Sequence, residues 1–134
     1  MEDISTGGCL CGAIRYQFSQ APLWAGYCHC DSCRRSTGAV VASFVGVSDA
    51  NISFSGDDRT IYPSSPGVRR GFCAKCGTPL TYEADNYPNE VHLYIGTLHN
   101  PENFPPQSHV HCHQQVGWFE VADSLPRHDR GSTE

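Results

Sequence analysis

The sequence predicts a single, mainly β domain made of short strands. Segments of alternating apolar and polar residues, or of consecutive β-branched residues, are separated by turns rich in glycine, proline and aspartate. No long segment carries the apolar period of an amphipathic helix. The 134 residues are enough for one compact core. We therefore expect one domain over residues 1–134, with an ordered core of about residues 5–127.

Strand patterns recur along the chain. The first begins at Ala13, where Ile14, Tyr16 and Phe18 alternate with polar residues. The apolar, β-branched run Val40–Val47 predicts a buried strand. Further short strands are predicted at Asn51–Phe54, Thr60–Tyr62, Val68–Phe72, Leu80–Tyr82, Val91–Ile95 and Ser108–His113.

Only single helical turns are expected. Asp31–Ser36 predicts one turn capped by Asp31 or Ser32, because such side chains accept hydrogen bonds from the first helical N–H groups. The pair Asn100-Pro101 predicts a second capped turn.

The C-terminal part of the chain carries two expectations about packing. Trp118 and Phe119 are candidates to close the hydrophobic core. The polar tail from Arg127 is expected to fray, as chain ends without apolar anchors do.

The charge of the chain excludes some classes of partner. The formal net charge is −5, and the basic residues form only two adjacent pairs, so nucleic acid and anionic membranes are not expected as partners. No apolar run approaches the roughly 20 residues that cross a bilayer. The first residues lack the basic and apolar regions of a secretory signal, so we expect a cytoplasmic protein.

Three of the eight cysteines fall within six residues. Cys28, Cys30 and Cys33 can point their sulfurs at one site from a short loop, and Zn²⁺ binds thiolates at about 2.3 Å. Three protein ligands leave a fourth position free, which is typical of a catalytic zinc. The alternative is that His29, His111, Cys112 or a distant group closes the site, which would make this zinc structural.

Cys73 and Cys76 have the spacing of a zinc knuckle, and Gly77 permits the tight turn after the second sulfur. This pair needs two more ligands, which Cys9 and Cys11 can supply. A closed four-thiolate site would join the N-terminus to the middle of the chain and stabilise a small domain. Disulfides are the alternative, but a reducing compartment and the tight Cys-x-Cys spacings argue against them.

Several residues near the open site have two interpretations. His29 lies between two proposed ligands, so we expect its side chain to point away from the metal, either as a proton shuttle or as an ordinary loop histidine. Arg34 and Arg35 are candidates to pair with a substrate carboxylate or to screen the anionic zinc site, and the alternative is a solvated helical turn.

The predicted strand Ser108–His113 carries alternating histidines. His109, His111 and His113 would share one face of this strand, as a metal-binding row or as an exposed polar face. Cys112 would lie on the other face as a small buried hydrophobic residue.

Three segments together resemble a known family. They are Cys9-Leu10-Cys11-Gly12-Ala13-Ile14-Arg15-Tyr16, Cys28-His29-Cys30-Asp31-Ser32-Cys33-Arg34-Arg35 and Arg70-Gly71-Phe72-Cys73-Ala74-Lys75-Cys76-Gly77-Thr78-Pro79-Leu80. In this order they resemble the glutathione-dependent formaldehyde-activating enzyme family, whose domain is shared with centromere protein V. Later matches to its C-terminal pattern are Gly96-Thr97-Leu98, Asn100-Pro101, His109-Val110, Trp118 and Leu125-Pro126-Arg127.

The resemblance implies a fold, a metal content and a reaction. The implied fold is the β-tent of short antiparallel strands stapled by zinc, as in methionine-R-sulfoxide reductase B. The implied cofactor is Zn²⁺ at two sites, one structural and one reactive, with the same division of cysteines. The implied reaction joins glutathione and formaldehyde into S-hydroxymethylglutathione, which is carbon–sulfur lyase chemistry. The expected partner is thus a small-molecule thiol such as glutathione.

Three functions are compared on this basis. The leading hypothesis is a zinc-dependent carbon–sulfur lyase acting on a thiol adduct. The second is a non-enzymatic binding module stapled by zinc, which predicts a second site indifferent to thiols. The third is a reductase similar to methionine-R-sulfoxide reductase B, in which Cys112 would be an exposed nucleophile with a lowered pKa.

Overall fold

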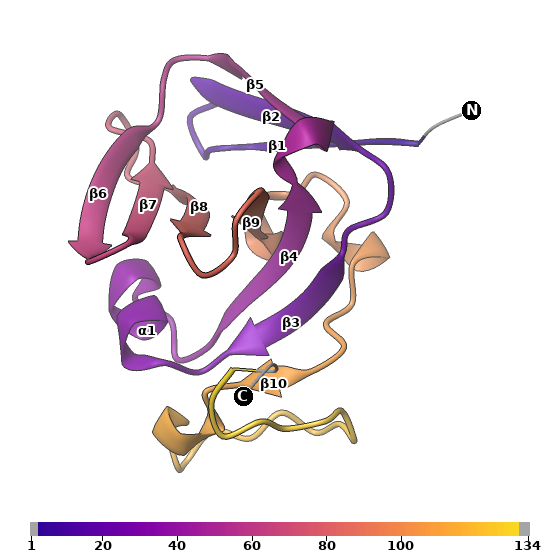
Figure 1. Cartoon of the computed structure of the whole chain (residues 1–134), viewed down its shortest axis with the longest axis vertical. Coiled ribbons are helices and arrows are strands. Elements are labelled where there is room, and N and C mark those ends of the chain that lie inside the picture. The colour runs from indigo at the N-terminus through magenta and orange to yellow at the C-terminus, as the bar shows by residue number, and fades with distance from the viewer. Residues whose placement is uncertain (1–2, 132–134) are drawn as a thin grey trace.

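Two β-sheets form the body of the molecule in the computed structural model, which describes residues 3–131 (Figure 1). The three-stranded sheet has the order β1 (Ile4–Gly8), β2 (Ile14–Ser19), β5 (Ile52–Gly56). The seven-stranded sheet has the order β10 (His109–Val110), β3 (Trp24–Cys28), β4 (Ala42–Ser48), β9 (Glu90–Tyr94), β8 (Pro79–Ala84), β7 (Val68–Phe72), β6 (Thr60–Ser65). The prediction of a mainly β fold is confirmed.

The helices are short. The described residues contain one α-helix, α1 (Asp31–Thr37), which follows β3. Four 3₁₀ turns are η1 (Asp49–Asn51), η2 (Ile95–Thr97), η3 (Pro101–Asn103) and η4 (Cys112–Gln114). Within residues 3–131, no helix is long and apolar enough to cross a membrane.

The central strands β4 and β9 are buried on both faces. On one face Val45 and Leu93 pack with Phe18 of the three-stranded sheet, which forms the main core. On the other face Phe44 packs in a second cluster that contains Cys28 and Cys33. The apolar run of β4 therefore contributes side chains to both faces of the sheet, to the main core on one face and to the cluster around Phe44 on the other.

Most predicted strands are found within a few residues of their expected ends, but two strands were missed. β1 has the sequence Ile-Ser-Thr-Gly-Gly, which lacks an alternating apolar pattern, and it is held by antiparallel pairing with β2. β3 contains Gly26, a residue type that weakens strand patterns in a sequence. There, glycine admits the close approach of the Ser108 backbone, and Tyr27 N–H donates to the Ser108 carbonyl at 2.8 Å.

The C-terminal segment differs most from the prediction. β10 stops at Val110 and pairs in parallel with β3, while the other strand pairs are antiparallel. His111 has a positive φ of 56°, so the proposed histidine row over Ser108–His113 is wrong. The tail does not fray as far as residue 131, because His128 N–H donates to the His109 carbonyl at 2.8 Å and Gly131 is buried. Residues 132–134 lie outside the described part of the chain.

Three local expectations also need correction. Trp118 is 78% exposed and does not close the core. The helix α1 is where a helical turn was predicted, but its cap is Cys30, whose sulfur accepts from the Cys33 N–H at 3.3 Å, and neither Asp31 nor Ser32. The turn η3 follows Asn100 as predicted, but the Asn100 side chain makes no capping hydrogen bond.

Candidate functional site

Two cysteine clusters are assembled by the fold. The first contains Cys9, Cys11, Cys73 and Cys76, whose sulfurs all lie within 4.8 Å of one another. The second contains Cys28, Cys30 and Cys33, within the same limit. Within residues 3–131 these are the groups of three or more metal-binding side chains that could hold an ion.

The first cluster has the dimensions of a tetrahedral thiolate site. Sulfur–sulfur distances are 3.7 Å for Cys9–Cys11 and 3.8 Å for Cys11–Cys73. Four sulfurs at 2.3 Å from a central ion would be about 3.8 Å apart, so the observed spacing fits without rearrangement. Gly12 and Gly77 both have a φ of +80°, which lets each short loop turn immediately behind its second sulfur.

Thr78 connects the two loops of the first cluster. Its hydroxyl accepts from the Leu10 N–H at 3.0 Å and lies 3.1 Å from the Cys76 sulfur, to which it can donate. Hydrogen bonds from the hydroxyl and the backbone of Thr78, together with one from the Cys11 backbone, lower the pKa of Cys76 to about 5, so the thiolate form required of a metal ligand is favoured at neutral pH.

The second cluster is built at the junction of β3 and α1. Cys28 ends β3, Cys30 caps the helix, and Cys33 lies buried in the first helical turn. Hydrogen bonds with Cys30 and Cys33, together with burial, raise the pKa of Cys28. Hydrogen bonds with Cys28 and Cys33 lower the pKa of Cys30. Because adjacent buried thiolates repel one another, the three sulfurs do not ionise independently.

A buried arginine lies against this cluster. Arg70 is 9% exposed, and its guanidinium nitrogens are 3.8 and 3.9 Å from the Cys33 sulfur. Its other partners are the neutral hydroxyls of Ser36, Ser64 and Tyr94 at 3.1 to 3.3 Å. Within residues 3–131, no carboxylate forms an ion pair with Arg70. The Cys33 sulfur is therefore the contacting group that would balance this buried cation once it is a thiolate.

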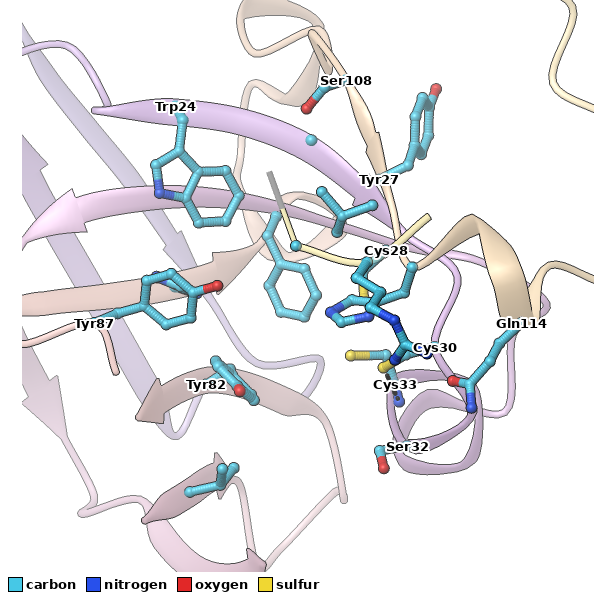
Figure 2. A pocket seen from close by; sticks show the side chains of 18 of the residues that line it. Trp24, Tyr27, Cys28, Cys30, Ser32, Cys33, Tyr82, Tyr87, Ser108 and Gln114 are labelled. Carbon is cyan, nitrogen blue, oxygen red and sulfur yellow. Dashed lines mark hydrogen bonds between the residues drawn. The ribbon is translucent and has the colours of Figure 1, made fainter. Parts of the chain in front are cut away.

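The second cluster opens on a cavity of about 570 Å³, over the face of the large sheet that carries Phe44. Figure 2 shows Cys30 and Cys33 on one side of this cavity, with Trp24 and Tyr87 on the opposite side and Tyr82 between them. A cavity of this size accommodates a small-molecule ligand.

The floor of the cavity follows one row of cross-strand neighbours. Arg70 of β7 pairs with Tyr82 of β8, Tyr82 pairs with His92 of β9, His92 pairs with Gly46 of β4, and Gly46 pairs with Trp24 of β3. Because residues in register lie on the same face of a sheet, five strands contribute to one surface.

Comparison with known proteins identifies the family. The model of the glutathione-dependent formaldehyde-activating enzyme family matches residues 4–114. The chain belongs to this family. It is 30% identical over 117 residues to an uncharacterized lyase of Schizosaccharomyces pombe, covering 87% of this chain and 85% of the relative. It also resembles the crystal structure of a Rhodobacter sphaeroides protein, with a TM-score of 0.60 and 23% identity over 73% of this chain and 93% of that one.

His29 lies outside the cluster in this member of the family, as predicted. It is fully buried, and its Nε2 is 2.8 Å from Nδ1 of His109, whose Nε2 is 3.0 Å from the carboxylate of Asp123. Since the carboxylate accepts from His109 Nε2–H, His109 Nδ1 accepts in turn from His29 Nε2–H. His29 Nδ1 has no hydrogen-bond partner in the described structure. This series of hydrogen bonds connects the loop of the second cluster to the C-terminal segment.

The residues that could have closed the second cluster do not join it. His111 lines the cavity but is not in the group of metal-binding side chains, and Cys112 is half-buried and outside the cavity lining. Arg34 and Arg35 pair with Asp31 at 3.7 and 3.0 Å and do not line the cavity. The exposed side chain of Arg35 fits the solvated helical turn, whereas the side chain of Arg34 is partly buried.

Sequence reasoning missed Arg70 as a site residue, and it also missed the cavity-lining rings of Trp24, Tyr82 and His92. In the sequence, Arg70 belongs to the basic pair Arg69-Arg70 and to the third family segment. Its signal was a charged residue within a predicted strand, three residues before the first cysteine of a metal knuckle. Trp24, Tyr82 and His92 gave no signal, because only the strand register brings them together.

Proposed function

We propose that this chain is a zinc-dependent carbon–sulfur lyase that acts on adducts of a small-molecule thiol. The candidate reaction joins glutathione and formaldehyde into S-hydroxymethylglutathione. The observation that carries the proposal is a cluster of three thiols that opens on a cavity beside a buried arginine. Family membership and the relative named as a lyase support a glutathione-related function of lyase type.

The two clusters have different roles in this proposal. Cys9, Cys11, Cys73 and Cys76 would hold a structural zinc, because four thiolates complete a tetrahedron. The other three cysteines, Cys28, Cys30 and Cys33, would hold a second zinc. Zinc bound there would supply a coordination position for the substrate sulfur and would favour its thiolate form at neutral pH.

The side chains around the second cluster set the charge and the polarity of the site. Three thiolates exceed the charge of one Zn²⁺ by one, and Arg70 supplies the balancing positive charge from 3.8 Å. Phe44, Tyr82 and Tyr94 pack against the cysteines, and these apolar surroundings would strengthen electrostatic interactions at the buried sulfurs.

The reaction itself needs no covalent bond to the protein. The thiol gives up its proton, its sulfur bonds to the carbonyl carbon, and the π electrons of the C=O bond move to oxygen, which then takes a proton. The reverse reaction breaks the same carbon–sulfur bond. The cavity brings the two reactants together, and this proximity lowers the barrier for addition.

Cys112 does not meet the requirements of the reductase alternative. That alternative needs an exposed thiol with a lowered pKa, but burial raises the pKa of Cys112. Its location outside the cavity lining also separates it from the three-cysteine cluster. The β-tent class is what the family resemblance implies, and the cytoplasmic location is expected from the sequence.

Exchange NMR with ¹³C-labelled formaldehyde and glutathione tests the proposed reaction. The rate of exchange between free formaldehyde and the hydroxymethyl adduct should rise in proportion to the concentration of zinc-loaded protein. Cys30→Ser should remove this increase, while Cys112→Ser should keep it as the matched control. No acceleration above the spontaneous rate for the folded, zinc-loaded protein would reject glutathione and formaldehyde as the reactants.

A further inference from the structure

The end of the cavity away from the cysteines is aromatic. His92 lies at its centre, with ring centroids 4.6 Å from Trp24, 5.0 Å from Tyr87 and 5.5 Å from Tyr82. Figure 2 shows the rings of Trp24, Tyr82 and Tyr87 facing the same open space. Aromatic faces carry partial negative charge, so several rings around one space favour a cation.

A carboxylate completes this end of the cavity. Glu90 lines it and is 24% exposed, and its Oε1 accepts from Trp24 Nε1–H and His92 Nε2–H, both at 3.1 Å. Burial lowers the pKa of His92, so His92 donates as a neutral ring at pH 7. Within residues 3–131, no lysine or arginine pairs with Glu90. Its negative charge is therefore available to a ligand.

The position of Trp24 depends on a glycine. A Cβ atom at Gly46 would overlap the indole ring, because the ring lies across the backbone of its cross-strand neighbour. Glycine weakens a central strand, so its presence here requires a compensating gain. That gain is space for the Trp24 indole, which lines the cavity and orients Glu90 through its hydrogen bond.

We propose that Trp24, Tyr82, Tyr87, Glu90 and His92 form a subsite for an ammonium group. The substrates would then be thiols that carry a positively charged nitrogen at a distance from the sulfur. The thiol part of this statement rests on the proposed function. Glutathione belongs to the class, since its γ-glutamyl end carries an ammonium group. Rings and carboxylate together would discriminate against neutral groups of the same shape.

Binding of choline and of its neutral isostere 3,3-dimethyl-1-butanol tests the subsite without a thiol. The ¹H–¹⁵N signal of the Trp24 indole, assigned by comparison with Trp118→Phe, reports binding because its N–H donates to Glu90. We expect choline to bind about tenfold more tightly than the alcohol. Glu90→Gln keeps an accepting oxygen but removes the charge, and should reduce this preference to less than about threefold. Glu102→Gln, on the exposed turn η3, is the matched control and should keep it.

Three outcomes would overturn the subsite. The first is equal binding of choline and the alcohol by the zinc-loaded protein. The second is a preference for choline that survives both Glu90→Gln and Tyr87→Leu; Tyr87→Leu removes a ring and provides the test if Glu90→Gln does not fold. The third is that neither probe binds.

The same titration on Cys30→Ser separates this inference from the proposed function. The variant is expected to lose the second zinc and to keep the aromatic end, so its preference for choline should be unchanged. If choline is preferred but thiols never change the zinc coordination, the lyase proposal fails and the subsite stands. If thiols bind to the zinc but thiocholine has no advantage over 3,3-dimethylbutane-1-thiol, the subsite alone fails.

Discussion

The two cysteine clusters differ more in their surroundings than in their sulfur spacing. The first has four sulfurs, lies between two glycine turns and has the exposed Cys11 at its outer side. The second has three sulfurs, faces a cavity and contacts the buried Arg70. In the proposed function, four ligands would close the first site around a structural zinc, whereas the cavity and the buried charge would make the second site reactive.

The largest expected effect follows from breaking the closed cluster. Cys73→Ser should leave the chain largely unfolded at 25 °C, because apparent zinc binding to structural sites contributes about 10–16 kcal/mol. Far-ultraviolet circular dichroism and zinc content measured on the same sample check this. Cys112→Ser should remain folded with two zinc ions. A folded Cys73→Ser protein that retains both ions would contradict the structural role.

Breaking the open cluster should spare the fold. Cys30→Ser should lose one zinc ion and the catalysed exchange, but α1 should persist, because serine is itself a preferred helix N-cap. Metal analysis and thermal unfolding measure the two consequences separately. An unchanged zinc content would show that Cys30 is not a ligand.

Replacing the buried arginine should weaken the open cluster alone. Arg70→Met removes the positive charge beside Cys33 and should reduce zinc affinity at the second cluster about 10- to 100-fold. Arg70→Lys should recover part of this loss by restoring charge without the guanidinium geometry. Chelator competition resolves the two sites, and the four-cysteine cluster should be unaffected in both variants. Equal weakening of both sites would indicate general destabilisation instead.

Acidification should reveal a smaller effect in the cavity wall. Burial lowers the pKa of His92 in the folded chain below its usual value of about 6.5. The stability that depends on neutral His92 is thus present above about pH 6.5 and is lost as the pH falls through the lowered value. Urea unfolding between about pH 7.5 and 5 should show a weaker decline for His92→Gln than for the wild type, and identical slopes would exclude His92 as a source of the decline.

The sequence predicted the cysteines better than the cavity. Cys28, Cys30 and Cys33 are close in the chain, so their convergence depends on one loop and can be recognised from spacing. Joining Cys9 to Cys73 over more than 60 residues followed from counting ligands, and the structure brings these sulfurs together.

The cavity wall could not be predicted because it depends on strand register. Trp24 and Tyr82 belong to strands separated by β4 and β9, and no local pattern fixes how these strands align. β3 was itself missed, since Gly26 resembles a turn residue until its contact with Ser108 is known. Strand β10 likewise ends at Val110, before the other two histidines of the predicted row, because the next residues form hydrogen bonds to residues 128–130, far along the chain.

X-ray absorption at the zinc edge during titration with glutathione tests the central claim most directly. It counts the sulfurs around zinc in the intact protein, with Cys30→Ser as the control that lacks the second site. The account predicts two zinc ions per chain and a rise in average sulfur coordination from about 3.5 toward 4 as glutathione occupies the open position. Two zinc ions whose coordination does not change with added thiol would contradict it, and would indicate two structural sites.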